Sequence, residues 1–318
     1  MRILFIIIFY YFLGSGDISA QRDSAYIELF PNLARINTGF RYRDRSLEFK
    51  TTSGEELKLE NQVLAFRIGG RLKFASYTFS IPIADLTAEM NEERSKNFGL
   101  GLTLFMRQHL LSGSFRSTKG FRSISSEGER VFRDDVDLFT ATLYGFHVFN
   151  NKQFSLRSSF KQRDRQIKRS GSFIGGLLLD RRRLLTDGLL IPLDNGEEEW
   201  LTRLAQTKVG VGVGYAHTFM FGERFFLTPF AVVGPEFRFI NFDAINGGKR
   251  QDDFRVSPRL RGYLAAGWNG DKTAVSLSAL YLPGLDITEN LDTRFNNFTV
   301  ELRITRRFLY PDRPKKNP

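Results

Sequence analysis

The sequence predicts an all-β fold, an antiparallel transmembrane β-barrel of about 12 strands (roughly 10–14). Two observations predict this class. Long segments alternate between apolar and polar residues with a period of two, whereas no long window after residue 35 shows the helical period of about 3.6. The chain also holds 32 phenylalanines and 28 glycines at a mean hydropathy of −0.26, so its many apolar residues are dispersed among polar ones.

Four segments show the alternation most clearly, with apolar residues at every second position. About 9–11 tilted residues are enough to cross a bilayer, whereas strands of soluble sheets typically have about 5–6 residues. We therefore favour a closed barrel over a soluble β-sandwich, since an open sheet edge is not tolerated in lipid. The segments are NFGLGLTLFM (97–106), FSLRSSFK (154–161), TAVSLSALY (273–281) and FTVELRITRRF (298–308).

Short turns and longer polar connections separate the predicted strands. Asn269 and Gly270 form an Asn-Gly pair, which is a strong hairpin signal. Counting back from the last strand puts the turns near 222 and 270 on the periplasmic side and the long loops outside. This pattern breaks before residue 170, because a turn at 150–152 and a polar hinge at 164–169 would lie on opposite sides. Long connections are expected near 81–96, with a short helix or loop insert at 84–94, and near 117–135, 181–205, 243–255 and 283–294.

The first 20 residues have the layout of a secretory signal peptide. Arg2 precedes an apolar run from Ile3 to Leu13, and Ala20 supplies the small residue before the cut. This run of 11 residues is shorter than the roughly 20 of a spanning helix, so a membrane anchor is the less favoured alternative. The chain has no cysteine and therefore no disulfide. We expect a signal peptide (1–20), a periplasmic N-terminal segment (21–34), the barrel (35–310) and a polar C-terminal tail (311–318).

The chain is basic, with 46 Lys and Arg residues against 35 Asp and Glu residues. A nucleic-acid partner is not expected, because the basic residues are dispersed among aromatic strands and an exported protein rarely meets nucleic acid. The expected partners are outer-membrane lipids, lipopolysaccharide, and the barrel-assembly machinery during biogenesis. Arg181, Arg182 and Arg183 begin one outer loop, where they either bind lipopolysaccharide phosphates or form a solvated strand end.

The stretch KVGVGVGYAHTF (208–219) has the glycine spacing of a nucleotide-binding loop but not its context. No helical pattern follows the glycines, and no acidic residue stands in a strand–helix–strand unit about 20 residues later. In a barrel strand, the three glycines face the lumen while the valines and Phe219 face lipid. Tyr215 or Phe219 would then join an aromatic girdle at the membrane interface.

Several stretches together resemble the family of outer-membrane barrels catalogued as domain of unknown function 4421. The resemblance spans most of the chain after the signal peptide. It implies an exported barrel in the outer membrane of a Gram-negative bacterium, and it implies no functional residue, because the family has no established activity. The stretches are YIELFPNLARI (26–36), FNNKQFSLRSSFKQ (149–162), KRSGSFIGG (168–176), GVGYAHTF (212–219) and FFLTPF (225–230).

Three histidines, His109, His147 and His217, are the only imidazoles available to a barrel enzyme. Candidate nucleophiles such as Ser112 and Thr218 exist, but no serine and histidine pair within one strand. No two histidines lie within four residues of each other, so no metal-binding spacing is present. We therefore expect no catalytic residue, no metal and no cofactor. An enzyme would need a histidine, a serine and a carboxylate to converge at the outer rim.

The polar faces of the predicted strands carry charged residues that would point into the lumen. Excess positive charge there favours anions if the lumen is open. Alternatively, Arg–Glu networks fill and rigidify a closed barrel. The candidates are Arg107, Arg157, Lys161, Glu301, Arg303 and Arg307.

These features favour a non-enzymatic outer-membrane barrel, either a small channel with a basic lumen or an accessory or structural subunit of an envelope complex. The alternative is an outer-membrane barrel enzyme, a hydrolase or acyltransferase that acts on envelope lipids.

Overall fold

The computed structural model describes residues 22–30, 33–51, 55–72, 75–88, 93–106, 108–125, 127–188, 190–194, 198–244, 251–287 and 291–309. The predicted signal peptide, the predicted C-terminal tail and Arg107 lie outside these residues. The wall strands are β2 (Leu33–Thr51), β3 (Glu56–Leu72), β4 (Ala75–Asp85), β5 (Lys96–Phe105), β6 (His109–Ser125), β7 (Arg130–Val148), β9 (Ser170–Leu185), β11 (Glu198–Phe221), β12 (Phe225–Ala244), β13 (Gln251–Asn269), β14 (Thr273–Ile287) and β15 (Leu291–Leu309).

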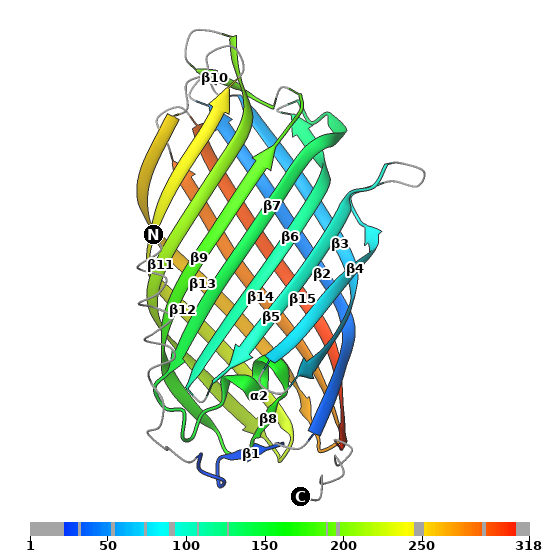
Figure 1. Cartoon of the computed structure of the whole chain (residues 1–318), viewed down its shortest axis with the longest axis vertical. Helices are drawn as coiled ribbons and strands as arrows, with labels where there is room; N and C mark the ends of the chain where they lie inside the picture. Colours follow the sequence, from blue (N-terminus) through cyan, green and yellow to red (C-terminus); the bar gives the residue numbers. More distant parts are fainter. Residues whose placement is uncertain are drawn as a thin grey trace, which may run out of the picture.

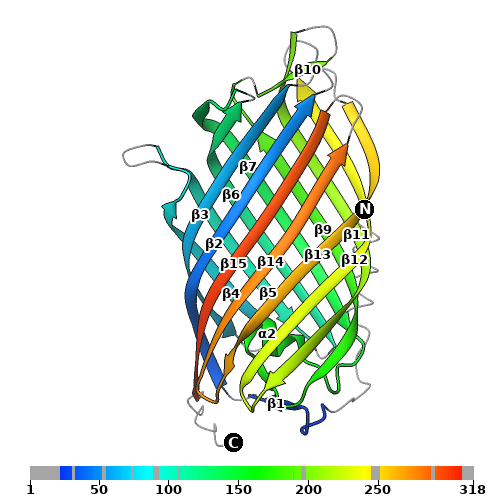
Figure 2. The same ribbon diagram turned by 180° about the vertical axis from the view of Figure 1, so that it is seen from behind.

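Within the described residues, these twelve strands form one antiparallel sheet that closes on itself. Each strand pairs with its neighbours in chain order, β9 pairs with β11, and β15 returns to pair with β2. The result is a tall barrel whose described chain ends lie at one end, together with the turns at 222–224 and 270–272 (Figures 1 and 2). We call this the lower end and the opposite one the upper end, as drawn in Figure 1. The predicted fold class and strand number are confirmed.

Inward and outward residues alternate along the wall strands. In β11, Val213 is 69% exposed on the outside, whereas Ala216 and Thr218 are fully buried inside. The glycines of this strand face inward as predicted, and Gly214 lies so close to β12 that a Cβ would approach the carbonyl oxygen of Ala231 to 2.0 Å. Large apolar side chains therefore cover the exterior, as lipid contact requires. They include Ile68, Phe79, Phe98, Phe115, Phe173, Val233, Leu264, Leu277 and Leu302.

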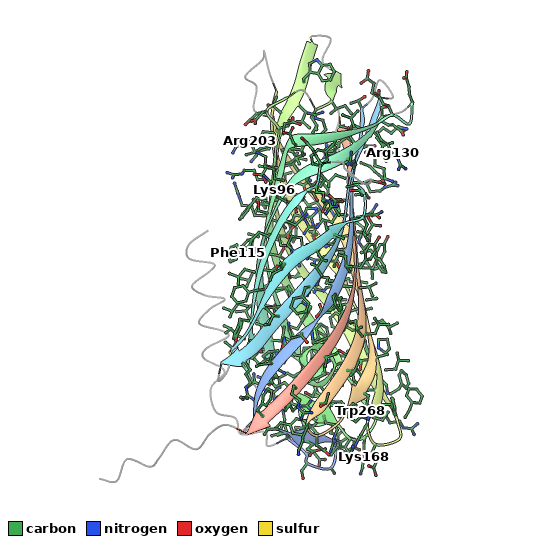
Figure 3. The ribbon with its side chains drawn as sticks, turned by 90° about the vertical axis from the view of Figure 1, so that its right-hand side faces the viewer. Lys96, Phe115, Arg130, Lys168, Arg203 and Trp268 are labelled. Carbon is green, nitrogen blue, oxygen red and sulfur yellow. The ribbon has the colours of Figure 1, made fainter. Side chains whose placement is uncertain are left out.

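The apolar belt ends below the upper rim. In Figure 3, Phe115 lies on the outer side of the wall and Lys96 lies above it. On β2, the outward positions change from the apolar Phe40 to Asp44 and Glu48. The upper part of the wall therefore stands outside the lipid-facing belt.

Several segments that the sequence suggests as loops are wall instead. The predicted connection 117–135 consists of the end of β6 and the start of β7 around a turn near 127–129, and the other long connections are also partly strand. The wall strands have 10 to 24 residues because they continue above the belt, where outward polar side chains resemble a loop in sequence. Of the predicted insert 84–94, residues 84–85 end β4, and 86–88 form a turn and a bend.

The predicted strand 154–161 is wrong. Its residues form the short helix α2 (Leu156–Lys161), followed by the short strand β8 (Asp164–Gln166). Leu156 and Phe160 are four residues apart, a spacing that fits both a strand face and a helix face, so a run this short does not distinguish the two. Among the described residues no helix is long and apolar enough to span a membrane.

The segment 149–169, which we call the plug, connects β7 to β9 at the lower end without crossing the barrel. Both the 150–152 turn and the 164–169 stretch therefore lie on one side, which removes the irregularity in the predicted sides. The N-terminal strand β1 (Ile27–Leu29) pairs with β8 below α2 (Figure 1). At the upper end, β10 (Pro192–Asp194) extends β11 as a small hairpin.

Candidate functional site

Two buried apolar clusters divide the interior of the barrel. The upper cluster consists entirely of wall residues and the neighbouring Leu190 and Ile191, whereas the lower cluster combines wall residues with the plug residues Phe154, Leu156 and Phe160. The upper cluster contains Leu47, Phe49, Leu59, Phe121, Val136, Leu138, Leu184, Leu190, Ile191, Leu201, Leu204, Ile240 and Phe295. The wall residues of the lower cluster are Phe105, Leu110, Phe146, Val148, Ile174, Ala216, Phe230 and Val232.

A polar chamber of about 210 Å³ lies between these clusters. Its lining contains ten basic side chains against three carboxylates, an excess of seven positive charges. Such an excess inside a protein wall is costly unless an anion or water compensates it. The basic residues are Arg41, Arg45, Arg67, Arg116, Lys161, Arg182, Lys208, Arg259, Arg261 and Arg303, and the carboxylates are those of Asp180, Glu236 and Glu301.

Glu301 is the centre of one charged group in the chamber. Arg41 stands directly opposite it on β2 and donates from Nη2 to Oε2 at 2.7 Å, and Arg303 donates from Nε to Oε1 at 2.9 Å. Arg67 reaches the same carboxylate from β3. One carboxylate therefore serves three guanidinium groups contributed by three adjacent strands.

Glu236 on β12 is the centre of a second group, formed with residues of β11, β12 and β13. Arg238 donates from Nε to Oε1 at 2.8 Å, and Arg259 donates from Nη1 to Oε2 at 3.2 Å. The Nζ of Lys208 lies 3.7 Å from Oε1. Nearby, the carboxylate of Asp180 accepts from Arg182 Nε at 2.7 Å. In this group too, the basic side chains outnumber the carboxylates with which they pair.

Other interior arginines, among them Arg116 and Arg43, have no carboxylate partner in the part of the chain that the structure describes. Arg116 lines the chamber, and Arg43 is 92% buried between Arg41 and Arg45 on the inner face of β2. No described carboxylate lies within ion-pair distance of either guanidinium. The chamber therefore has donors to spare for a negatively charged guest.

Three wall arginines hold the C-terminal end of α2. Arg303 donates to the carbonyl of Phe160, Arg35 to that of Lys161, and Arg307 to that of Gln162 at 2.7 Å. The last carbonyls of a helix have no partner within the helix and carry partial negative charge. Basic side chains of the wall satisfy them here and fix the plug.

Asp164 anchors the other half of the plug. Its carboxylate accepts from Ser155 Oγ at 2.8 Å and from Arg157 Nε at 2.9 Å, and it also pairs with Arg22. Burial would raise the pKa of Asp164, but the guanidinium groups of Arg157 and Arg22 outweigh burial and hold the pKa below its ordinary value. The carbonyl of Asp164 accepts from Asn269 on β13 at 2.9 Å.

The charged residues singled out in the sequence occupy different places. Glu301 and Arg303 lie in the chamber, and Lys161 lines it from α2 rather than from a strand. Arg157, also on α2, belongs to the Asp164 anchor, and Arg307 lies near the lower end, where it also donates to Asn269 Oδ1 at 2.6 Å. Arg107 is outside the described residues.

Sequence reasoning missed most of the chamber. Lys208 shares the inner face of β11 with Gly210, and Glu236 and Arg238 are two residues apart on β12. That spacing was available in the sequence. The sequence did not show that these residues lie close to Arg259 and Asp180, because this proximity depends on the register of four strands.

The histidines do not form a catalytic arrangement among the described residues. His109 and His147 stand opposite each other at the lower ends of β6 and β7, with their Nδ1 atoms 3.3 Å apart. His217 contacts the hydroxyl of Tyr215 at 3.3 Å on the outer face. Ser112 bonds to Thr103 at 2.9 Å instead of to a histidine. The described residues also contain no group of three or more His, Asp or Glu side chains that could hold a metal ion.

A family model, described as "Domain of unknown function (DUF4421)", matches residues 21–308. The chain belongs to this family. No curated protein matches it.

Solved structures of barrels are similar to the fold at low identity. The outer membrane protease OmpT from Escherichia coli has 9% identity and a TM-score of 0.45, and the match covers 91% of this chain and 100% of that one. An outer membrane channel from Pseudomonas putida F1 has 11% identity and a TM-score of 0.36 over 91% and 100% of the two chains. The toluene transporter TodX from Pseudomonas putida has 8% identity and a TM-score of 0.33 over 87% and 90%.

Proposed function

We propose that the protein is a barrel of the Gram-negative outer membrane whose basic chamber binds a small anion and whose plug controls its passage. The observation that carries the proposal is the lining of ten basic side chains against three carboxylates. A chamber of about 210 Å³ is smaller than the roughly 300–1,000 Å³ of sites for drug-sized ligands, so it fits a headgroup or an inorganic anion.

The apolar belt and the short turns support an orientation in which the lower end of the barrel faces the periplasm. In outer-membrane barrels the short turns face the periplasm. The lower end of this barrel has a three-residue turn at 222–224 between β11 and β12 and another at 270–272 between β13 and β14. We therefore assign the plug and β1 to the periplasmic side.

The resting state of this channel is closed. The upper cluster and the plug each fill the interior, so an ion crosses only when the plug moves and the side chains of the upper cluster rearrange. The plug is the candidate gate, because it is a separate segment held largely by side-chain contacts.

Lipopolysaccharide is a proposed partner at the outer wall. Arg181 and Arg183 are exposed on the outside of β9 above its apolar positions, whereas Arg182 between them points inward to Asp180. Two outward guanidinium groups at this height suit lipid phosphates. The barrel-assembly machinery is a proposed partner during biogenesis.

The test is binding of inorganic phosphate to the refolded barrel, followed by calorimetry, together with single-channel recording in planar bilayers. We expect phosphate binding that Arg116→Gln and Arg259→Gln weaken, and few or no openings in the intact protein. Absence of binding would remove the anion function and leave the accessory or structural role. Selectivity for cations in any open state would also contradict the proposal.

A further inference from the structure

The wall of the barrel has a break between β4 and β5. These strands pair from Ala75 and Leu104 up to Ser80 and Gly99, and no pairing continues above that point within the described residues. Ile81–Asp85 pair only with β3, and Lys96–Phe98 pair only with β6. In Figure 1 both strands lie in the wall, drawn in cyan.

The break is closed again above. There β3 pairs directly with β6, from Leu57 with Ser125 to Glu60 with Arg122. Just below, the carboxylate of Asp85 accepts from the backbone N–H of Ser95 at 2.8 Å and from its hydroxyl at 2.6 Å. This break in backbone pairing, which we call the window, is therefore bounded, with paired strands below it and a polar contact above it.

The window lies at the upper edge of the apolar belt. Ile81 is 56% exposed, Ile83 51% and Phe98 61%, so its outer margin is apolar. Pro82 stands in the unpaired stretch, and proline has no backbone N–H that would need a partner in lipid. One strand away, the outward positions of β6 change from the apolar Phe115 to Lys119.

The inner margin of the window is part of the chamber. Ser80, Gly99 and Arg116 line it, and a Cβ on Gly99 would stand 3.8 Å from both Arg116 Cγ and Ser80 Cβ. At Gly99 no side chain stands between Ser80 and Arg116, an arginine that has no described carboxylate partner. At the window, apolar side chains on the outer face of the wall therefore lie close to a basic side chain on the inner face.

We infer that this window admits a single-chain amphiphile with an anionic head, a fatty acid or an alkyl phosphate, from the outer leaflet. The head lies in the chamber against Arg116, and the alkyl chain leaves through the window past Ile81 and Phe98. The chamber volume of about 210 Å³ takes a head but not a whole lipid, which is why the chain must remain outside. The inference rests on the proposed anion-binding function and adds the ligand class and the route.

The experiment compares dodecyl phosphate, dodecanoate and inorganic phosphate, with dodecyl maltoside as the uncharged probe of equal chain length. Binding is followed by the shift of the unfolding midpoint in nanodiscs of zwitterionic lipid. Gly99→Trp fills the window, and Ser80→Leu narrows it from the opposite strand. Gly262→Trp is the matched control, since nothing lies within 4 Å of a Cβ there. Heat-modifiable migration verifies that each variant is folded.

We expect both alkyl anions to bind the natural protein and Gly262→Trp, and dodecyl maltoside not to bind. Gly99→Trp and Ser80→Leu should weaken the alkyl anions by about tenfold or more and inorganic phosphate clearly less, although both residues also line the chamber, whereas Arg116→Gln should weaken all three anions equally. Unchanged binding of the alkyl anions by both window variants would overturn the inference. Binding of inorganic phosphate alone would overturn it too and leave the proposed function intact. If none of the three anions binds, both the inference and the proposed function are overturned.

Discussion

The two ends of the barrel interior are closed in different ways. The upper cluster is built from side chains of the wall and the adjoining loop, including Phe49 and Phe295, so it cannot leave as a unit and opens only by rearrangement of side chains. The lower closure is the plug. It is not a strand of the wall, and it is held by its two chain ends and by side-chain contacts. Wall arginines bind the carbonyls at 160–162, and Asp164 joins Arg157 of the plug itself to Arg22 of the N-terminal segment. One closure of the lumen is therefore part of the wall, and the other is a separate segment of the chain.

Removing the plug should have the largest effect. Replacement of residues 151–168 by a short Gly-Ser linker should convert a closed barrel into one with large, anion-selective openings if the upper cluster leaks once its neighbour is gone. Single-channel recording and reversal potentials in a salt gradient measure this. A folded deletion variant that remains silent would show that the upper cluster alone seals the lumen.

The Glu301 group should matter most for stability. Glu301→Gln leaves Arg41, Arg67 and Arg303 without their shared carboxylate, and breaking a buried ion pair from one side costs about 3–5 kcal/mol. Urea unfolding in detergent measures the loss. Glu56→Gln is the control, because Glu56 pairs with Lys50 on the exposed rim and its loss should be undetectable. Equal midpoints for the two variants would contradict this account.

A cavity in the upper cluster should weaken the barrel without opening it. Phe49 is 1% exposed, so Phe49→Ala should cost about 3 kcal/mol of unfolding free energy. Its conductance should stay at the level of the natural protein, because the surrounding wall side chains remain. Openings as frequent as those of the plug deletion would erase the distinction between the two ends.

Acidity should act on the plug through Asp164. The folded pKa of Asp164 is depressed, so its contribution is complete above the ordinary carboxyl pKa of about 4 and is lost as the pH falls through the lower folded value. Openings should therefore be rare between pH 8 and 5 and become more frequent below about pH 4. Asp164→Asn should open at neutral pH and lose this dependence. A variant that keeps the acid response of the natural protein would show that another group is responsible.

The sequence predicts the wall of this barrel better than its interior. Alternation over 298–308 and the glycines at 210–214 identify strands and faces correctly, because a strand's two faces are a local property. The helix at 156–161 was missed because its apolar spacing of four residues suits both periods. The chamber was found only in part, since Glu301 and Arg303 are neighbours on one strand, whereas Glu236 meets Lys208 and Arg259 through cross-strand register. The break above Ser80 and Gly99 depends on register alone.

The direct pairing of β3 with β6 has a consequence for the construction of the barrel. Above the window the wall consists of ten strands, and below it of twelve, because β4 and β5 end early. The β4–β5 hairpin is thus inserted between β3 and β6, two strands that already pair with each other above it. Both rings have an even number of strands, as an antiparallel circle of consecutive hairpins requires. The length of this one hairpin therefore sets the height at which twelve strands give way to ten, while the pairing of β3 with β6 closes the upper wall.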